Sequence, residues 1–145
     1  MKGDDIIMSK YHIFISHAWK YSEHYDKVVE WLNEAQCEGK LTWSNYSVPV
    51  HDPLVDPNTV VGKNKLKQEL KGQIQPASKV LILAGMYAAH SDWIDYEIDT
   101  AYDMNKHIIG IKPWGQERIP SKISIYADEI VGWNKASVIN ALLNS

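Results

Sequence analysis

The sequence predicts an α/β protein in which helices cover both faces of a five-stranded parallel sheet. Short apolar runs alternate with segments of helical spacing five times along the 145 residues. The clearest run, Val80–Ala84, is apolar throughout and is followed by Gly85, which is typical of a strand buried on both faces. For one domain of this length we expect a flavodoxin-like three-layer fold with the strand order 2-1-3-4-5.

The first strand and the first helix follow a short polar segment. Residues 1–9 have no regular period and are expected to be a flexible N-terminal tail, so the domain comprises residues 10–145. Tyr11–Ser16 is predicted to be the first strand. Apolar residues at helical spacing predict an amphipathic helix over roughly 22–37, and Gly39 suits the left-handed position that ends it.

The middle of the chain contains the longest segment without a period. A second strand is predicted to begin at Leu41–Trp43. Residues 44–62 contain three prolines and match neither a helix nor a strand. A loop of that length is usually functional or mobile. Helical spacing returns over residues 63–74 and stops before Pro76.

The third strand, Val80–Ala84, leads into the helix that carries the central residues of the chain. That helix is predicted over about 92–105, with Ser91 as its N-cap. Trp93 and Glu97 are four residues apart and therefore share one face of the helix. The buried face is expected to contain Ile94, Ile98, Ala101 and Tyr102.

The last third of the chain completes the sheet. His107–Ile111 is the predicted fourth strand, a short helical turn is predicted over 121–128, and a short fifth strand over 129–133. A final helix is predicted over 135–143, and Asn134 is its expected cap.

Composition and charge exclude several kinds of partner. The formal net charge is −3, whereas general nucleic-acid binders are usually basic, so no nucleic-acid partner is expected. No apolar run approaches the length that crosses a bilayer, and no membrane association is expected. Cys37 is the only cysteine, and we expect it to be a buried thiol of a cytoplasmic protein.

Several motifs of nucleotide binding and catalysis are absent. The chain has neither G-x-G-x-x-G nor G-x-x-x-x-G-K-[ST], and it lacks the G-x-S-x-G of serine hydrolases. The first strand is followed by Ser16-His17 in place of the aspartate that a receiver domain needs. The six histidines show no H-E-x-x-H spacing and no tight pair, so no metal site is expected.

Polar and aromatic residues follow each of the first three predicted strands. Parallel strands end at a common edge, and open α/β sheets bind ligands there. The residues concerned are Ser16, His17 and Trp19, then Ser44, Asn45 and Tyr46, then Ser91, Trp93 and Glu97. Taken singly, Glu97 fits an ordinary helix glutamate and Trp93 a packing residue. The functional interpretation depends on their convergence around one carboxylate.

These segments resemble the TIR domain superfamily. The resemblance lies in Phe14-Ile15-Ser16-His17 and in Ser91-x-Trp93-x-x-x-Glu97-Ile98. More narrowly, Phe14-Ile15-Ser16-His17-x-Trp19, Asn45-Tyr46-Ser47-Val48-Pro49 and Val131-Gly132-Trp133-Asn134 are similar to the TIR-like family of the Thoeris antiphage protein ThsB.

The resemblance implies an enzyme of prokaryotic antiviral defence that breaks the nicotinamide–ribose bond of NAD and makes a cyclic or conjugated ADP-ribose signal. It implies NAD as substrate without a resident cofactor, a separate effector protein that receives the signal, and possible self-association. It also implies that Glu97 is catalytic. The implied substrate-binding residues are Phe14, Ser16, His17, Trp19, Asn45, Tyr46 and Trp93.

A single carboxylate is sufficient for this chemistry. Glycosidases usually need two carboxyl groups because a poor leaving group must be protonated. The nicotinamide of NAD is cationic and leaves as a neutral molecule, so the protein must mainly stabilise an oxocarbenium-like ribose.

Two other functions remain open from the sequence. Many TIR domains are non-catalytic scaffolds, and the 44–62 loop and the numerous tryptophans would then belong to an interface. A flavodoxin-like domain that holds another nucleotide is the third interpretation.

Overall fold

The computed structural model confirms the predicted fold class. Five strands form one sheet in the order β2-β1-β3-β4-β5, and every neighbouring pair is parallel. The structure describes residues 10–16, 22–47, 60–84, 87–112 and 119–145, without the side chains of 22, 60–63, 66 and 87–92. The predicted tail, residues 1–9, lies outside the described residues.

Strands and helices alternate along the whole described chain. In order they are β1 (Lys10–Ile15), α1 (Ser22–Cys37), β2 (Thr42–Asn45), α2 (Val60–Ile74), β3 (Lys79–Leu83), α3 (Tyr87–Asp103), β4 (His107–Ile111), α4 (Ser121–Tyr126), β5 (Glu129–Val131) and α5 (Lys135–Leu143).

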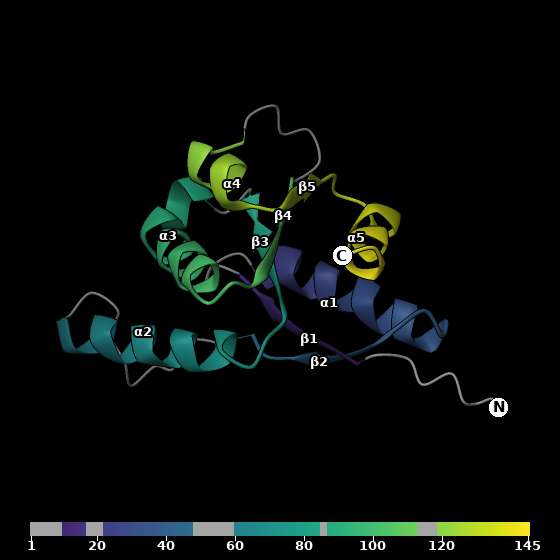
Figure 1. The fold of residues 1–145 in the computed structure, drawn as a ribbon, viewed down its shortest axis with the longest axis horizontal. Coiled ribbons are helices and arrows are strands. Elements are labelled where there is room, and N and C mark those ends of the chain that lie inside the picture. The colour runs from purple at the N-terminus through teal and green to yellow at the C-terminus, as the bar shows by residue number, and fades with distance from the viewer. Residues whose placement is uncertain (1–9, 17–21, 48–59, 85–86, 113–118) are drawn as a thin grey trace.

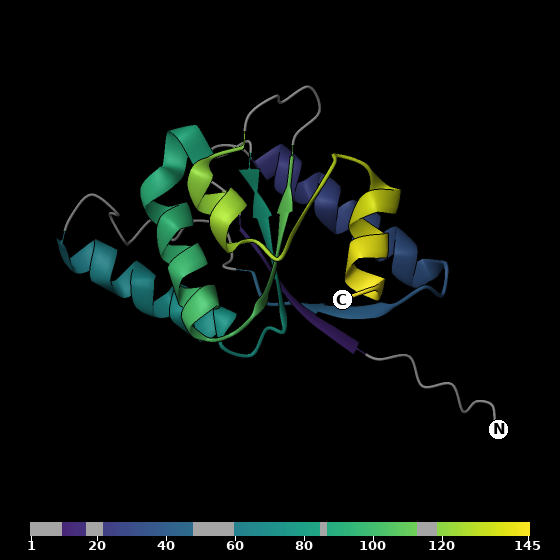
Figure 2. The ribbon, with the colours of Figure 1, turned by 45° about the horizontal axis from the view of Figure 1, so that its top comes forward.

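The elements form three layers, with the sheet in the middle (Figures 1 and 2). Helices α1 and α5 pack together on one face, and α2, α3 and α4 cover the other. The central strands β3 and β4 are buried over four of their five residues, because helices exclude water from both of their faces. No helix in the described ranges is long and apolar enough to cross a membrane.

The register of β1 and β2 fixes which side chains face which helices. Tyr11 lies beside Trp43, and the Trp43 indole donates a hydrogen bond to Asn33 of α1 at 3.0 Å. The odd-numbered side chains of β1 therefore face α1. Since side chains alternate along a strand, Phe14 and Ser16 point to the opposite face, which α2 and α3 cover.

The start of α3 and one residue of its buried face differ from the sequence-based prediction. The helix begins at Tyr87, so Ser91 lies inside the helix and is not its N-cap. Tyr102 was expected to be buried but is 56% exposed. It follows the buried Ala101 by one residue, a rotation of about 100° around the helix, and its ring packs edge-on against Tyr126 of α4 at a centroid distance of 4.9 Å.

Two predicted helix ends are confirmed. Gly39 follows α1 with a φ of 76°, a conformation that suits glycine. Asn134 precedes α5, and its side chain accepts a hydrogen bond from the Ser137 amide at 2.8 Å. Cys37, by contrast, is exposed: it lies on the outer side of α1, away from the buried Leu32 and Ala35.

Candidate active site

Glu97 is the one buried carboxylate among the described residues. It lies on α3 and is 4% exposed. Ile94, Ile98 and Ala101 of the same helix are buried against the sheet, and this apolar stripe holds the neighbouring Glu97 in a fixed place. The remaining described carboxylates are half-buried or exposed, so Glu97 differs from an ordinary surface glutamate.

The environment of Glu97 favours the protonated acid. Burial raises the pKa of Glu97 from 4.5 to about 8, and the Ser16 hydroxyl works in the opposite direction. Burial dominates because a carboxylate loses most of its hydration in an apolar surrounding. In the part of the chain that the structure describes, no positive side chain contributes to lowering the pKa of Glu97.

Ser16 lies directly after β1 and is completely buried. Its amide donates a hydrogen bond to the Leu81 carbonyl at 2.8 Å, which continues the β1–β3 ladder and keeps Ser16 on the α2/α3 face. Neither Ser16 Oγ nor Glu97 Oε1 has a hydrogen-bond partner within the described residues. Two buried polar atoms are thus left unpaired, and unpaired buried groups in native proteins need an explanation. The influence of the Ser16 hydroxyl on the Glu97 pKa indicates that the two side chains are near each other.

Trp93 lies one helical turn before Glu97 on α3. The side chain is half-buried and packs against the hydrophobic core. Since α3 runs antiparallel to the strands, Trp93 is nearer than Glu97 to the carboxyl edge of the sheet. The structure therefore places Trp93, Ser16 and Glu97 in one region.

Phe14 and Tyr46 have structural contacts of their own. Phe14 is 1% exposed and belongs to the core. The Tyr46 hydroxyl and His12 Nδ1 are 3.0 Å apart, and His12 precedes Ser16 by four strand residues, about 13 Å. The structure thus does not bring the Tyr46 hydroxyl to Ser16, and substrate contacts by these two residues stay predictions.

Asn45 lies on the opposite face of the sheet from Glu97. Its side-chain amide donates to the Tyr25 hydroxyl of α1 at 2.8 Å, and its side-chain carbonyl accepts from the Ser47 amide at 2.8 Å. Both polar ends of Asn45 are therefore engaged in ending β2 and joining it to α1.

The two other predicted site residues, His17 and Trp19, lie outside the described residues. So do most of the predicted 44–62 loop and the residues 113–118 that follow β4. These segments connect to the carboxyl ends of strands.

Thr100 is a buried polar residue that the sequence analysis did not single out. It lies one turn beyond Glu97 and is 9% exposed. The sequence signal for its burial was weak. Thr100 stands next to the apolar stripe residues Ile98 and Ala101, but a threonine at such a position is common in helices.

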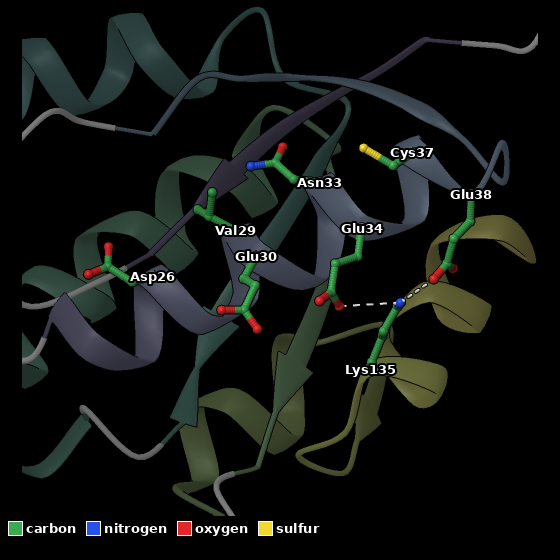
Figure 3. A pocket seen from close by; sticks show the side chains of 8 residues that line it. All are labelled: Asp26, Val29, Glu30, Asn33, Glu34, Cys37, Glu38 and Lys135. Carbon is green, nitrogen blue, oxygen red and sulfur yellow. Dashed lines mark hydrogen bonds and ion pairs between the residues drawn. The ribbon is translucent and has the colours of Figure 1, made fainter.

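A separate groove of about 640 Å³ lies over α1 and α5 (Figure 3). Carboxylates line it at every fourth residue along α1 and at Glu38 directly after that helix. Lys135 of α5 pairs with Glu34 and Glu38 at 3.3 and 2.8 Å. Its lining residues are Asp26, Val29, Glu30, Asn33, Glu34, Cys37, Glu38 and Lys135. The groove is on the other face of the sheet from Glu97, and its acidic wall would repel a pyrophosphate.

The fold and the buried acid define a flavodoxin-like α/β domain with a single carboxylate beside a serine at the end of the first strand. The sequence matches the family described as Thoeris protein ThsB, TIR-like domain, over residues 14–118. The chain therefore belongs to this TIR-like family, and the matched range includes both Ser16 and Glu97.

Comparison with solved structures agrees with the fold. A conserved protein from Enterococcus faecalis V583 has a TM-score of 0.63 at 8% identity, over 94% of this chain and 99% of that chain. The Clostridium botulinum CMP N-glycosidase BcmB has a TM-score of 0.54 at 12% identity, over 90% of this chain and 97% of that chain. At these identities the likeness shows the fold alone. Comparison with curated proteins finds no match.

Proposed function

We propose that this protein cleaves the nicotinamide–ribose bond of NAD and makes a cyclic or conjugated ADP-ribose signal for a separate effector in antiviral defence. One observation carries the proposal: Glu97 has a buried carboxyl group near Ser16, and its Oε1 has no hydrogen-bond partner within the described residues. A carboxyl in this environment destabilises the fold, and such groups are concentrated at functional sites. Membership of the TIR-like family supports the same activity.

The chemistry requires Glu97 to become ionised when substrate is bound. With a pKa of about 8, the free protein holds mostly the neutral acid at pH 7. The cationic nicotinamide ring, and then the oxocarbenium-like ribose, lower that pKa because opposite charges attract at short range. The carboxylate thus forms where positive charge develops, and it stabilises that charge electrostatically.

Trp93 is suited to hold a flat ring of the substrate. Its indole is half-buried one turn from Glu97, and aromatic faces stack on nicotinamide and on adenine alike. We assign Trp93 the substrate-stacking role. The segments that would complete the pocket include His17 and Trp19, which lie outside the described residues.

A nucleoside monophosphate is a second candidate substrate. BcmB, which shares the fold, is a CMP N-glycosidase. Cytosine is a neutral base and leaves more easily when it is protonated. A Glu97 that is protonated at pH 7 could supply that proton as a general acid.

A non-catalytic scaffold remains the alternative function, and one surface favours it. Ile125 of α4 is 71% exposed and Tyr102 of α3 is 56% exposed. Tyr102 contacts Tyr126, so apolar groups are exposed on both helices. Exposed apolar patches commonly mark contacts between proteins.

Mass spectrometry of nucleotides separates these functions. Cells that express the wild type, Glu97→Gln or Glu69→Gln would be compared with and without phage infection, because infection can be the trigger. Glu69 is an exposed glutamate of α2 and serves as the matched control. We expect NAD loss and a new ADP-ribose product in the wild type and in Glu69→Gln, but not in Glu97→Gln. CMP loss with free cytosine would identify the second substrate, and unchanged nucleotides during a functional defence response would favour the scaffold.

A further inference from the structure

We propose that Ser16 is a positioning residue whose hydroxyl sets the protonation state of Glu97. The proposal rests on the proposed function for its effect on catalysis. The placement of the two side chains near each other rests on their burial, on the strand alternation of β1 and on the influence of Ser16 on Glu97. Both residues are buried, at 0% and 4% exposure. Ser16 directly follows β1 and Glu97 lies on α3, so the fold brings these distant parts of the sequence together.

The backbone holds Ser16 rigidly in this place. Its amide is bonded to the Leu81 carbonyl at 2.8 Å, and the adjacent Ile15 amide donates to Ser47 Oγ at 3.0 Å. The ladder thus extends past the last residue of β1. The Ser16 side chain must therefore point toward the α2/α3 layer, where Glu97 lies.

The serine hydroxyl is available to Glu97 because it is otherwise unused. Ser16 Oγ has no hydrogen-bond partner among the residues described, and a hydroxyl proton rotates freely to suit its acceptor. When Glu97 ionises, its oxygens become acceptors only, and a charge-assisted hydrogen bond shortens and strengthens. Catalytic hydrogen bonds are often poorly aligned in free enzymes and tighten in the complex.

Three charged groups on the helices around Glu97 are engaged elsewhere. On α3 itself, Asp99 pairs with Lys122 of α4 at 2.6 Å. On α2, Lys67 lies 5.3 Å from the centre of the Tyr96 ring. The pKa of Lys122 is raised by Asp99 and, more weakly, by Asp95 of α3. The charge of Asp95 thus also acts on Lys122 of α4.

The titratable groups of the strands lie toward the amino edge of the sheet. His12 of β1 is bonded to Tyr46 at 3.0 Å. Lys79 of β3 interacts with Glu129 and Asp128, and His107 of β4 lies 3.1 Å from Glu129. Within the described residues, the Ser16 hydroxyl is therefore the one group that favours the carboxylate form of Glu97.

A direct titration of Glu97 tests the proposal without any substrate. The protein would be labelled with ¹³C at the glutamate carboxyl carbons, and the Glu97 signal, assigned through Glu97→Gln, would be followed from pH 5 to pH 10. Because a hydrogen bond to the charged form favours the carboxylate, Ser16→Ala should raise the Glu97 pKa by roughly one pH unit. Ser124→Ala is the matched control, since Ser124 is an exposed serine of α4.

Two further variants keep the test decisive. Ser16→Cys has nearly the same volume but a weak donor, so it should raise the pKa of Glu97 as Ser16→Ala does, even if the alanine variant folds poorly. Ser16→Thr retains the hydroxyl and should restore a value near that of the wild type. The proposal would be overturned if folded Ser16→Ala or Ser16→Cys had the same Glu97 pKa as the wild type.

The pH dependence of NAD cleavage then separates this proposal from the proposed function. Ser16→Ala should lower kcat/KM about tenfold at pH 7 and regain most of it at pH 10, because the carboxylate is restored there. A purely structural defect would lower the rate at both pH values. If the pKa of Glu97 moves but no variant cleaves NAD, the role of Ser16 stands and the proposed function fails. If Glu97-dependent cleavage is found but Ser16→Ala leaves the Glu97 pKa unchanged, Ser16 does not set the protonation state of Glu97.

Discussion

The side-chain amide of Asn45 donates a hydrogen bond to the hydroxyl of Tyr25 at 2.8 Å, and this contact joins β2 to α1 on the face of the sheet away from Glu97. A residue that the sequence motif assigns to the substrate therefore has a complete structural explanation. Measurements of stability and of substrate binding can distinguish a structural role of Asn45 from a substrate contact.

Replacing Asn45 by alanine should affect stability and leave substrate binding unchanged. The change removes two hydrogen bonds of a largely exposed residue, so the free energy of unfolding should fall by about 1 kcal/mol. Urea denaturation measures this, with Asn64→Ala on the exposed side of α2 as the control. A large increase of KM for NAD in Asn45→Ala, with normal stability, would instead support a substrate contact.

The folded protein should lose stability as the pH rises from about 4.5 to about 8. The folded-state pKa of Glu97 is raised to about 8, so between these values the native state binds more protons than the unfolded state, and the free energy of unfolding decreases with pH. The favourable contribution is complete below pH 4.5 and is lost above pH 8.

Glu97→Gln should remove this pH dependence. Relative to the wild type, the free energy of unfolding of the variant should increase with pH above 4.5, and the difference should reach on the order of 2–5 kcal/mol above pH 8. Denaturation at several pH values gives the difference, and Glu69→Gln should run parallel to the wild type. Parallel curves for Glu97→Gln and the wild type would mean that Glu97 is not held as a neutral acid.

Gly110 is needed for α4 to pack on the sheet. A Cβ at this position would lie 3.0 Å from Cγ2 of Ile123 and 3.4 Å from Cγ1 of Ile130. Gly110→Ala should therefore lower the free energy of unfolding by about 1–3 kcal/mol. Gly72→Ala is the matched control: a Cβ there meets nothing within 4 Å, and alanine within a helix should add about 0.5–1 kcal/mol. Equal stabilities of the two variants would contradict the close packing of α4.

Ile125→Asp tests whether the exposed surface of α3 and α4 is needed for activity. Because Ile125 is 71% exposed, the free energy of unfolding should change by less than about 0.5 kcal/mol. An enzyme that acts through Glu97 alone should retain its rate of NAD cleavage in this variant. A lower solution mass together with lost function would support the scaffold function, and light scattering with a cleavage assay measures both.

The fold could be predicted from the sequence because its signals are local and agree with one another. Val80–Ala84 and His107–Ile111 are uninterrupted apolar runs, and their alternation with helices leaves few possible topologies. The start of α3 was misplaced because Ser91 and Asp92 imitate a helix N-terminus, although the backbone is already helical from Tyr87.

The candidate site was predictable in part. The spacing of Trp93 and Glu97 placed them on one face of a helix, and the position of Ser16 after the first strand placed it at the same edge of the sheet. The burial of Glu97 and its lack of a charged partner depend on tertiary packing, which no sequence pattern reports. The face of Asn45 followed from strand alternation once the register with β1 was known.

The most direct test of the central claim is nicotinamide release from NAD by purified Glu97→Gln, compared with the wild type and Glu69→Gln under conditions that activate the wild type. Glutamine matches the shape of the neutral acid but cannot ionise. If the Glu97 carboxylate stabilises the transition state, kcat should fall at least roughly 10²–10³-fold while the fold is retained. Release at the wild-type rate by folded Glu97→Gln would show that the reaction does not depend on this carboxyl group.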